Sequence, residues 1–390
     1  MTFSLSFVLW LKILFLIGTG SAGYIKDKYP PSVLEDANLD MFGLTRKYHY
    51  PLEGHFVTTE DKYILRLFRL SHPKGRPVFL MHGLLDSSIT WLINGPWGGL
   101  GYYLYDLGYD VWMGNARGNF YSRNHTAYNA DTDKSFWSFS WHEIGFYDLP
   151  ASIDYVLNKT GYDKLAYFGH SQGTTTFFVM ASLRPEYNQK ITLMSALAPV
   201  AYFKNNHSPL LPLLQNFVAV ASNIVNEFLP RTDVLKVCMQ SKSAEHNCLT
   251  YIYLLMGKDP NMWNTTMIPV YLSHAPSGCN FKQIKHYAQL VESGRFCQYD
   301  YGPTENQKRY KSTKPPEYPL KNIVAPVALY YAYNDYLTNY KDVIHLAKEL
   351  PKVVENCLYP DKKWNHVSMV WGLHARELAH KHMIEMMRKF

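Results

Sequence analysis

The sequence predicts an α/β fold: a mainly parallel sheet whose strands alternate with helices, interrupted by a mostly helical insertion. Short apolar runs, each bounded by turn residues, recur along the chain at 76–83, 109–115, 164–169, 191–199 and 325–332. Segments with helical spacing lie between them, at 143–161 and 174–183. This alternation is typical of a parallel sheet covered by helices.

The individual elements follow from local residue patterns. Residues 54–70, GHFVTTEDKYILRLFRL, predict two strands around a turn at Glu60 and Asp61. In RPVFLMHG, 76–83, an apolar run with Val and Phe that a glycine ends predicts a buried strand. The helix over 143–161 contains Pro150 as an interior irregularity and ends near Gly161.

The alternation stops after Pro199 and resumes near residue 321. We therefore predict a core made of 24–199 and 321–390, with a helical cap inserted at 200–320. The apolar stretch SPLLPLLQNFVAVASNIV, 208–225, forms either a lid over the site or the packed interior of the cap, and both alternatives stay open. A last helix is expected at about 372–388.

Composition excludes several classes of protein. Of 390 residues, 47% are hydrophobic and 18% are charged, as in ordinary globular proteins. The formal net charge of +7 is modest, and no dense Lys/Arg run carries interleaved aromatic residues. A nucleic-acid partner is therefore not expected.

The N-terminus predicts entry into the secretory pathway. Phe7 to Ile17 is apolar except for Lys12, and small residues follow, so residues 1–22 are expected to be a signal peptide. No later stretch is long and apolar enough for an integral membrane span. The sequence therefore predicts a secreted or lysosomal protein. Four glycosylation sequons agree with this, at Asn124, Asn158, Asn206 and Asn264.

Five cysteines fit an oxidising compartment. Proximity in the sequence suggests that Cys238 pairs with Cys248 and Cys279 with Cys297, which leaves Cys357 free. Sequence alone does not determine this connectivity, and five reduced cysteines remain the alternative.

The stretch YFGHSQGTTT, 167–176, places Ser171 at the centre of a Gly-x-Ser-x-Gly motif. The motif follows a predicted buried strand and opens a predicted helix, which is the setting of a nucleophile elbow. The flanking glycines leave room for neighbouring backbone, and the helix N-terminus favours developing negative charge. The alternative is a serine that caps the helix beside a tight turn.

A serine hydroxyl needs a base and an acid, which follow in the order Ser, acid, His in α/β hydrolases. Asp335 comes directly after the strand 325–332, whereas its rivals Asp342 and Asp300 are expected in a helix start and in the cap. His366 lies in a predicted loop. The other late histidines, His374, His380 and His382, are expected within the last helix.

Two backbone N–H groups are expected to form an oxyanion hole. One belongs to Gln172, directly after the serine, and the other to Leu84, in the loop after the strand 76–83, with Gly83 as the rival. His82 precedes the serine, so we expect it to organise this loop and not to act as the base.

Several motifs in order resemble the acid lipase family, whose members include gastric lipase, lysosomal acid lipase and many insect lipases. The matching stretches include HFVTTEDKYILRLFRL, FLMHGLLDSSITWLINGP, LGYDVWMGNARGNFYSRNH, LAYFGHSQGTTTFF and YLSHAPSG, and the resemblance runs from about Tyr48 to the end. It implies an α/β-hydrolase core with a cap and lid. It also implies a triad of Ser171, Asp335 and His366, oxyanion donors at Leu84 and Gln172, and a disulfide between Cys238 and Cys248.

The chain departs from the family pattern at two places near these motifs. Lys62 stands where the family usually has glycine in Asp-Gly-Tyr, and Val367-Ser368-Met369 replaces Leu-Asp-Phe after the histidine. The family's extra unpaired cap cysteine is also absent. The pH optimum of the acid-acting members is therefore not carried over.

The resemblance implies hydrolysis of neutral lipid esters, either triacylglycerol or sterol esters, at a lipid–water interface. The reaction needs no metal and no organic cofactor. Two alternatives are a catalytically silent protein that binds or stores lipid and an esterase for soluble short-chain esters.

Overall fold

The computed structural model describes residues 23–212, 218, 221, 225–231, 234–259 and 263–390. The predicted signal peptide, residues 1–22, lies outside the described residues. Most of the second half of the stretch 208–225 does so too, and the structure therefore does not test its interpretation as a lid.

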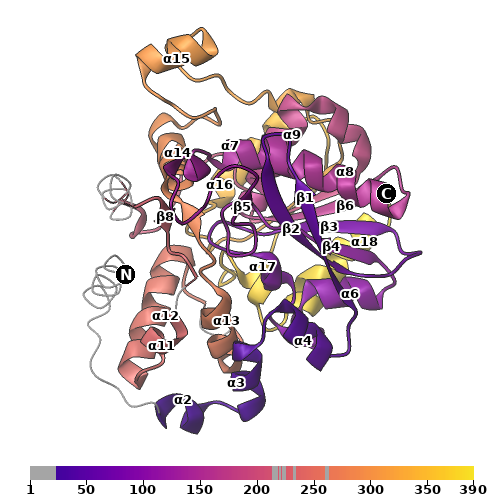
Figure 1. Ribbon diagram of the computed structural model, residues 1–390, viewed down its shortest axis with the longest axis vertical. Helices are drawn as coiled ribbons and strands as arrows, with labels where there is room; N and C mark the ends of the chain where they lie inside the picture. The colour runs from indigo at the N-terminus through magenta and orange to yellow at the C-terminus, as the bar shows by residue number, and fades with distance from the viewer. Residues whose placement is uncertain (1–22, 213–217, 219–220, 222–224, 232–233, 260–262) are drawn as a thin grey trace.

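A nine-stranded sheet forms the centre of the molecule, with the strand order β1-β2-β4-β3-β6-β7-β10-β11 and β5 beside β2 (Figure 1). β2 pairs antiparallel with β1, β4 and β5, and every neighbouring pair from β4 to β11 is parallel. The predicted mainly parallel sheet is confirmed. The strands are β1 (Leu52–Thr58), β2 (Tyr63–Leu70), β3 (Pro77–Met81), β4 (Asp110–Met113), β5 (Asn124–His125), β6 (Leu165–His170), β7 (Ile191–Leu197), β10 (Val327–Tyr331) and β11 (Val353–Leu358).

Helices cover both faces of the sheet because the buried strands present apolar side chains on both sides. Along β3, Phe79 belongs to one hydrophobic cluster, whereas Val78 and Leu80 belong to another. The first cluster includes residues of α8 (Leu149–Thr160), α9 (Gln172–Leu183) and α16 (Tyr340–Glu349). The second includes residues of α6 (Leu100–Asp106), α17 (Ser368–Trp371) and α18 (Lys381–Met387).

Two predicted helices are less regular than the sequence suggested. The segment 143–161 consists of the end of α7 (Trp141–Glu143), a π-helical stretch η3 (Ile144–Asp148) and α8, with Pro150 in the first turn of α8. The last helix consists of a π-helical stretch η7 (Arg376–His380) followed by α18. His374 precedes this helix in a turn, so its predicted helical placement was wrong.

Short helices complete the first part of the chain. They are α2 (Gly23–Lys28), α3 (Pro31–Asn38), α4 (Met41–Lys47), η1 (Ser88–Trp91), α5 (Gly95–Gly98), η2 (Lys134–Trp137) and η4 (Pro185–Lys190).

The segment between β7 and β10 is mostly helical where the structure describes it, and α11, α12 and α13 lie beside one another to the left of the sheet in Figure 1. Tyr271 of α13 and Leu290 of α14 each enter a cluster that also contains strand residues, so the segment packs into the core. Its elements are β8 (Glu227–Phe228), α11 (Val234–Cys238), α12 (Lys242–Met256), η5 (Thr265–Met267), α13 (Ile268–His274), β9 (Cys279–Asn280), α14 (Phe281–Ser293), α15 (Pro303–Tyr310) and η6 (Leu320–Asn322).

None of the helices in the described part of the chain combines the length and the apolar character that crossing a bilayer requires.

Candidate active site

Ser171 occupies a sharp turn between β6 and α9, with φ 52° and ψ −117°. A residue other than glycine adopts this backbone only where the surroundings hold it there, at a cost of about 1–3 kcal/mol. A Cβ added to Gly173 would lie 2.3 Å from the Met81 carbonyl oxygen, and one added to Gly169 would lie 2.7 Å from the Gly173 carbonyl oxygen. Both glycines of the motif are therefore required by close backbone approach.

Ser171, His366 and Asp335 form one hydrogen-bonded series. His366 Nε2 lies 2.8 Å from Ser171 Oγ, and His366 Nδ1 lies 2.8 Å from Asp335 Oδ2. A carboxylate only accepts hydrogen bonds, so Nδ1 carries the hydrogen, and Nε2 is left to accept from the serine hydroxyl. The structure thus brings together the three residues that the sequence singled out.

The loop after β10 orients the carboxylate of Asp335, which is buried. The backbone N–H groups of Leu337 and Thr338 donate to Asp335 Oδ1 at 2.9 and 2.7 Å. The Thr338 hydroxyl donates to Oδ2, the oxygen that also accepts from His366. The rival Asp342 lies in the first turn of α16, as predicted.

The loop after β3 lies directly against the serine. A Cβ added to Gly83 would be 3.2 Å from Ser171 Cβ, so the residue before Leu84 lies close to the Ser171 side chain. Gln172 is the first residue of α9, and its side-chain Nε2 donates to Gln283 Oε1 of α14 at 2.7 Å. Leu84 and Ser171 both line one cavity.

His82 organises this loop, as predicted. Its Nε2 lies 3.1 Å from the backbone N of Ala116 and 3.1 Å from Asn119 Nδ2, both donors, so Nδ1 carries the hydrogen and donates to the Gly83 carbonyl at 2.7 Å. Burial lowers the pKa of His82 to about 4. The ring is therefore neutral at physiological pH, and both of its nitrogens already have hydrogen-bond partners. His82 is thus not available as the catalytic base.

A cavity of about 410 Å³ opens at Ser171 and His366. Its walls are mainly aliphatic and aromatic side chains, and much of the wall comes from the segment between β7 and β10. Residues that line it from that segment include Phe228, Leu249, Ile252, Leu272, Ile284 and Val291. Such a lining suits an extended apolar group better than a polar one.

The end of α12 contacts the loops that carry both the acid and the histidine. The Met256 carbonyl accepts from the backbone N–H of His366 at 3.3 Å and of Tyr336 at 3.4 Å. Asn365 Nδ2 donates to the Gly257 carbonyl at 2.8 Å. Sequence reasoning missed both Asn365 and Gly257, although a glycine after a helical run is a recognised sign of a helix end.

Ser368 replaces the aspartate of the family pattern, and it lies near a buried carboxylate from another segment. The Ser368 hydroxyl lies 2.9 Å from Asn365 Oδ1 and 3.4 Å from Oδ2 of the fully buried Asp259. A carboxylate thus lies near the histidine loop in this chain too, but it comes from the segment after α12.

The cysteine predictions are half right. Cys238 and Cys248 form a disulfide that links α11 and α12. The suggested pair of Cys279 and Cys297 was wrong, since both are buried free thiols. Their surroundings explain this: Cys279 packs in a small cluster with Phe228 and Phe281, whereas Cys297 belongs to the main core.

The four sequons differ in accessibility. Asn124, in β5, and Asn158, in α8, are exposed. Asn206 and Asn264 are half-buried, and each side chain hydrogen bonds to nearby backbone.

Comparisons with known proteins agree with the observed fold. The family described as alpha/beta hydrolase fold matches residues 76–372, and the partial alpha/beta-hydrolase lipase region matches residues 43–95. Lipase 1 of Drosophila melanogaster is 41% identical over 360 residues, covering 92% of this chain and 82% of that protein. Gastric triacylglycerol lipase of Rattus norvegicus is 37% identical, covering 90% of this chain and 92% of that protein.

Among solved structures, DcsB in complex with its substrate analogue superposes with a TM-score of 0.54 at 11% identity, covering 87% of this chain and 99% of that one, which shows the fold alone. The sequence identity to the lipases extends over nearly the whole chain, so it shows a shared family and not only a shared fold. The chain belongs to the acid lipase family of α/β hydrolases.

Proposed function

We propose that this protein is a lipase that hydrolyses carboxylic esters of neutral lipids, triacylglycerols or sterol esters, through an acyl-enzyme. One observation carries the proposal: the hydrogen-bonded series of Ser171, His366 and Asp335 opens into a large cavity with an apolar lining. Relatives named as lipases, including a gastric triacylglycerol lipase, support the same substrate class.

In the first half of the reaction, His366 Nε2 takes the proton from Ser171 as Oγ attacks the ester carbonyl. Asp335 holds the imidazole in the tautomer that leaves Nε2 free to accept this proton, and it stabilises the imidazolium that forms. The alcohol then leaves with the proton from His366. In the second half, His366 Nε2 takes a proton from water as the water oxygen attacks the acyl carbonyl, and His366 returns that proton to Ser171 Oγ as the fatty acid leaves.

The backbone N–H groups of Leu84 and Gln172 are the proposed oxyanion donors. Gln172 begins α9, so its N–H belongs to the first turn, where amides have no partner within the helix. Leu84 follows Gly83, which lies against Ser171 and lines the same cavity. Each such donor contributes about 10²–10³-fold to kcat in comparable enzymes.

We also infer the domain organisation of the chain and its destination in the cell. Residues 24–199 and 321–390 form the hydrolase core, and 200–320 form the cap that shields the acyl chain. Residues 1–22 direct the chain into the secretory pathway, for a secreted or lysosomal destination. The exposed sequons at Asn124 and Asn158 are the best-placed sites for glycosylation.

The experiment measures fatty-acid release from a long-chain triacylglycerol emulsion, from a sterol ester and from a soluble short-chain ester. Wild type is compared with Ser171→Ala, and Ser135→Ala serves as the control because Ser135 is exposed and remote in sequence from the motif. We expect emulsion activity that Ser171→Ala reduces by several orders of magnitude and that Ser135→Ala leaves unchanged.

Other outcomes would reassign the function. Activity on the soluble ester alone would identify an esterase. A folded protein without activity on any ester, from acid to neutral pH, would identify a silent lipid-binding protein.

A further inference from the structure

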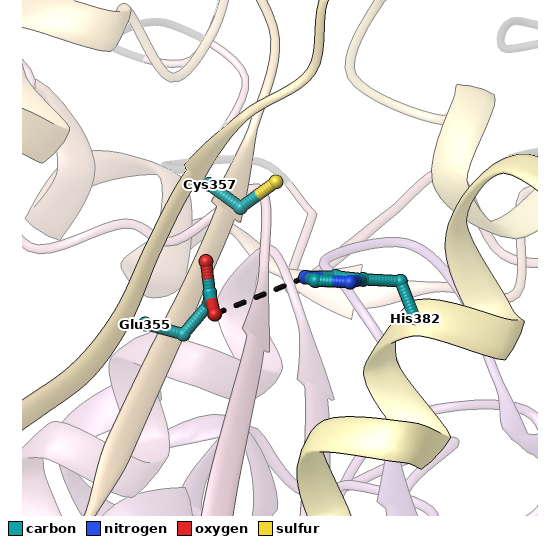
Figure 2. A group of neighbouring side chains, drawn as sticks. All are labelled: Glu355, Cys357 and His382. Atoms are coloured by element: carbon teal, nitrogen blue, oxygen red, sulfur yellow. Dashed lines mark ion pairs between the residues drawn. The ribbon is translucent and has the colours of Figure 1, made fainter.

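Glu355, Cys357 and His382 form a cluster that the proposed hydrolysis does not use. Figure 2 shows Glu355 and Cys357 projecting from β11 toward α18, where the ring of His382 points back at them. One ligand atom from each residue lies within 4.8 Å of the other two. Residues two apart on a strand share a face, so the backbone itself places the carboxylate and the thiol together.

An ordinary ion pair accounts poorly for this arrangement. His382 Nε2 lies 3.9 Å from Glu355 Oε2, which is beyond hydrogen-bonding distance, and no described residue hydrogen bonds to that nitrogen. The side chains are 44% and 25% exposed, so an ion pair between them would contribute little to stability. The thiol of Cys357 is not in a disulfide.

The three groups match the ligand preferences of one class of metal ion. Zn²⁺ accepts thiolate sulfur, imidazole nitrogen and carboxylate oxygen, whereas Ca²⁺ and Mg²⁺ select oxygen ligands. One thiolate and one carboxylate neutralise the charge of a divalent ion. The His382 and Glu355 side chains are partly exposed although Nε2 itself is buried, so rotation of these side chains admits the ion, and a water supplies the fourth ligand.

The spacing is close to what Zn²⁺ requires. Bond lengths of about 2.0–2.3 Å place tetrahedral ligand atoms about 3.4–3.6 Å apart. The observed 3.9 Å between Nε2 and Oε2, and the limit of 4.8 Å for the whole cluster, therefore require a contraction of about 1 Å or slightly more. Small side-chain rotations of three half-buried residues supply such a movement.

We propose that Glu355, Cys357 and His382 bind one Zn²⁺ ion, at a site separate from Ser171 and its partners. Among the strands that the structure describes, β11 lies at the end of the strand order and pairs with β10 alone. The ion joins this edge strand to the C-terminal helix α18. Because it binds the folded protein, Zn²⁺ raises the melting temperature.

The test uses the full-length protein after treatment with a chelator. Co²⁺ is titrated first, because a thiolate ligand gives it a charge-transfer absorption band, and Zn²⁺ binding is then measured by calorimetry. We expect one ion per chain, a thiolate band in the wild type and none in Cys357→Ser. Zn²⁺ affinity should fall by about tenfold or more in Cys357→Ser and in His382→Gln.

Two controls separate this site from other ligands. His374→Gln removes an exposed histidine that precedes the same helix, and His366→Ala removes the histidine of the proposed triad. Both should retain wild-type Zn²⁺ affinity, and metal-free melting curves establish that each variant is folded. The absence of a thiolate band, wild-type affinity in Cys357→Ser, or loss of binding in His366→Ala would overturn the proposal.

Discussion

The side-chain amide of Asn365 donates a hydrogen bond of 2.8 Å to the carbonyl oxygen of Gly257, so the residue before His366 is held by the residue after α12. Asn365 Oδ1 also accepts from the backbone N–H of Val367 and from the Ser368 hydroxyl. The position of the imidazole thus depends on a segment that is distant in sequence.

Replacing Asn365 with alanine should lower kcat by about 10–100-fold, because small displacements of a catalytic group have effects of this size. KM should change much less, since the cavity wall does not include Asn365. Steady-state kinetics on the triacylglycerol emulsion, below the melting temperature of the variant, test this. Asn356→Ala, on the exposed side of β11, is the matched control. An Asn365→Ala enzyme with wild-type kcat would show that the contact does not position His366.

Gly257 can lie this close to Asn334 and Asn365 because it has no side chain. Its φ is +105°, and an added Cβ would lie 1.9 Å from the Asn334 carbonyl oxygen. We expect Gly257→Ala to destabilise the protein by clearly more than the ~1–2 kcal/mol that a left-handed backbone costs an L-residue. Gly161 provides a control without a clash, because it has φ +73° with open space around it, so Gly161→Ala carries only the cost of a left-handed backbone. Equal losses of unfolding free energy in urea would argue against the clash.

The Ser171 turn could be predicted from the sequence, whereas the contacts of Asn365 and Gly257 could not. The Ser171 turn was predictable because a strand, two glycines and a helix are contiguous in the chain, and each local requirement indicates the same turn. The Asn365–Gly257 contact joins distant segments, and neither residue carries a local signal for the other. β11 was missed because VVENCL mixes apolar and polar residues and is only half-buried, so neither a continuous apolar run nor strict alternation is present.

We expect Asp86 to make the stability of the protein depend on pH. This carboxyl lines the cavity, is 8% exposed and accepts from the backbone N–H of Ser87 at 2.7 Å. Burial raises its pKa to about 7, despite the opposing hydrogen bonds from Ser87 and Thr90. In the unfolded chain an aspartate titrates near 3.9. Between about pH 4 and pH 7 the folded state therefore binds more protons, so this contribution to stability is lost as pH rises.

Asp86→Asn should remove this dependence. The variant should gain stability relative to wild type as pH rises from about 4 to 7.5, by at most about 4 kcal/mol at 1.36 kcal/mol per pKa unit. Urea unfolding at several pH values measures the difference, in which the contributions of the buried histidines cancel. A difference that stays constant across this pH range would mean that Asp86 is ionised in the folded protein.

Lys62 stands in the turn between β1 and β2 with φ +75°, where the family usually has glycine. Its side chain is exposed, so the substitution affects mainly the backbone. Relief of left-handed strain is worth about 1–2 kcal/mol, and the greater freedom of glycine in the unfolded chain offsets about 0.4–1 kcal/mol of it. Lys62→Gly should therefore stabilise the protein by up to about 1.6 kcal/mol, measured as unfolding free energy. Lys62→Ala keeps the Cβ and should gain nothing, so an equal gain in both variants would place the effect in the lysine side chain and not in the turn.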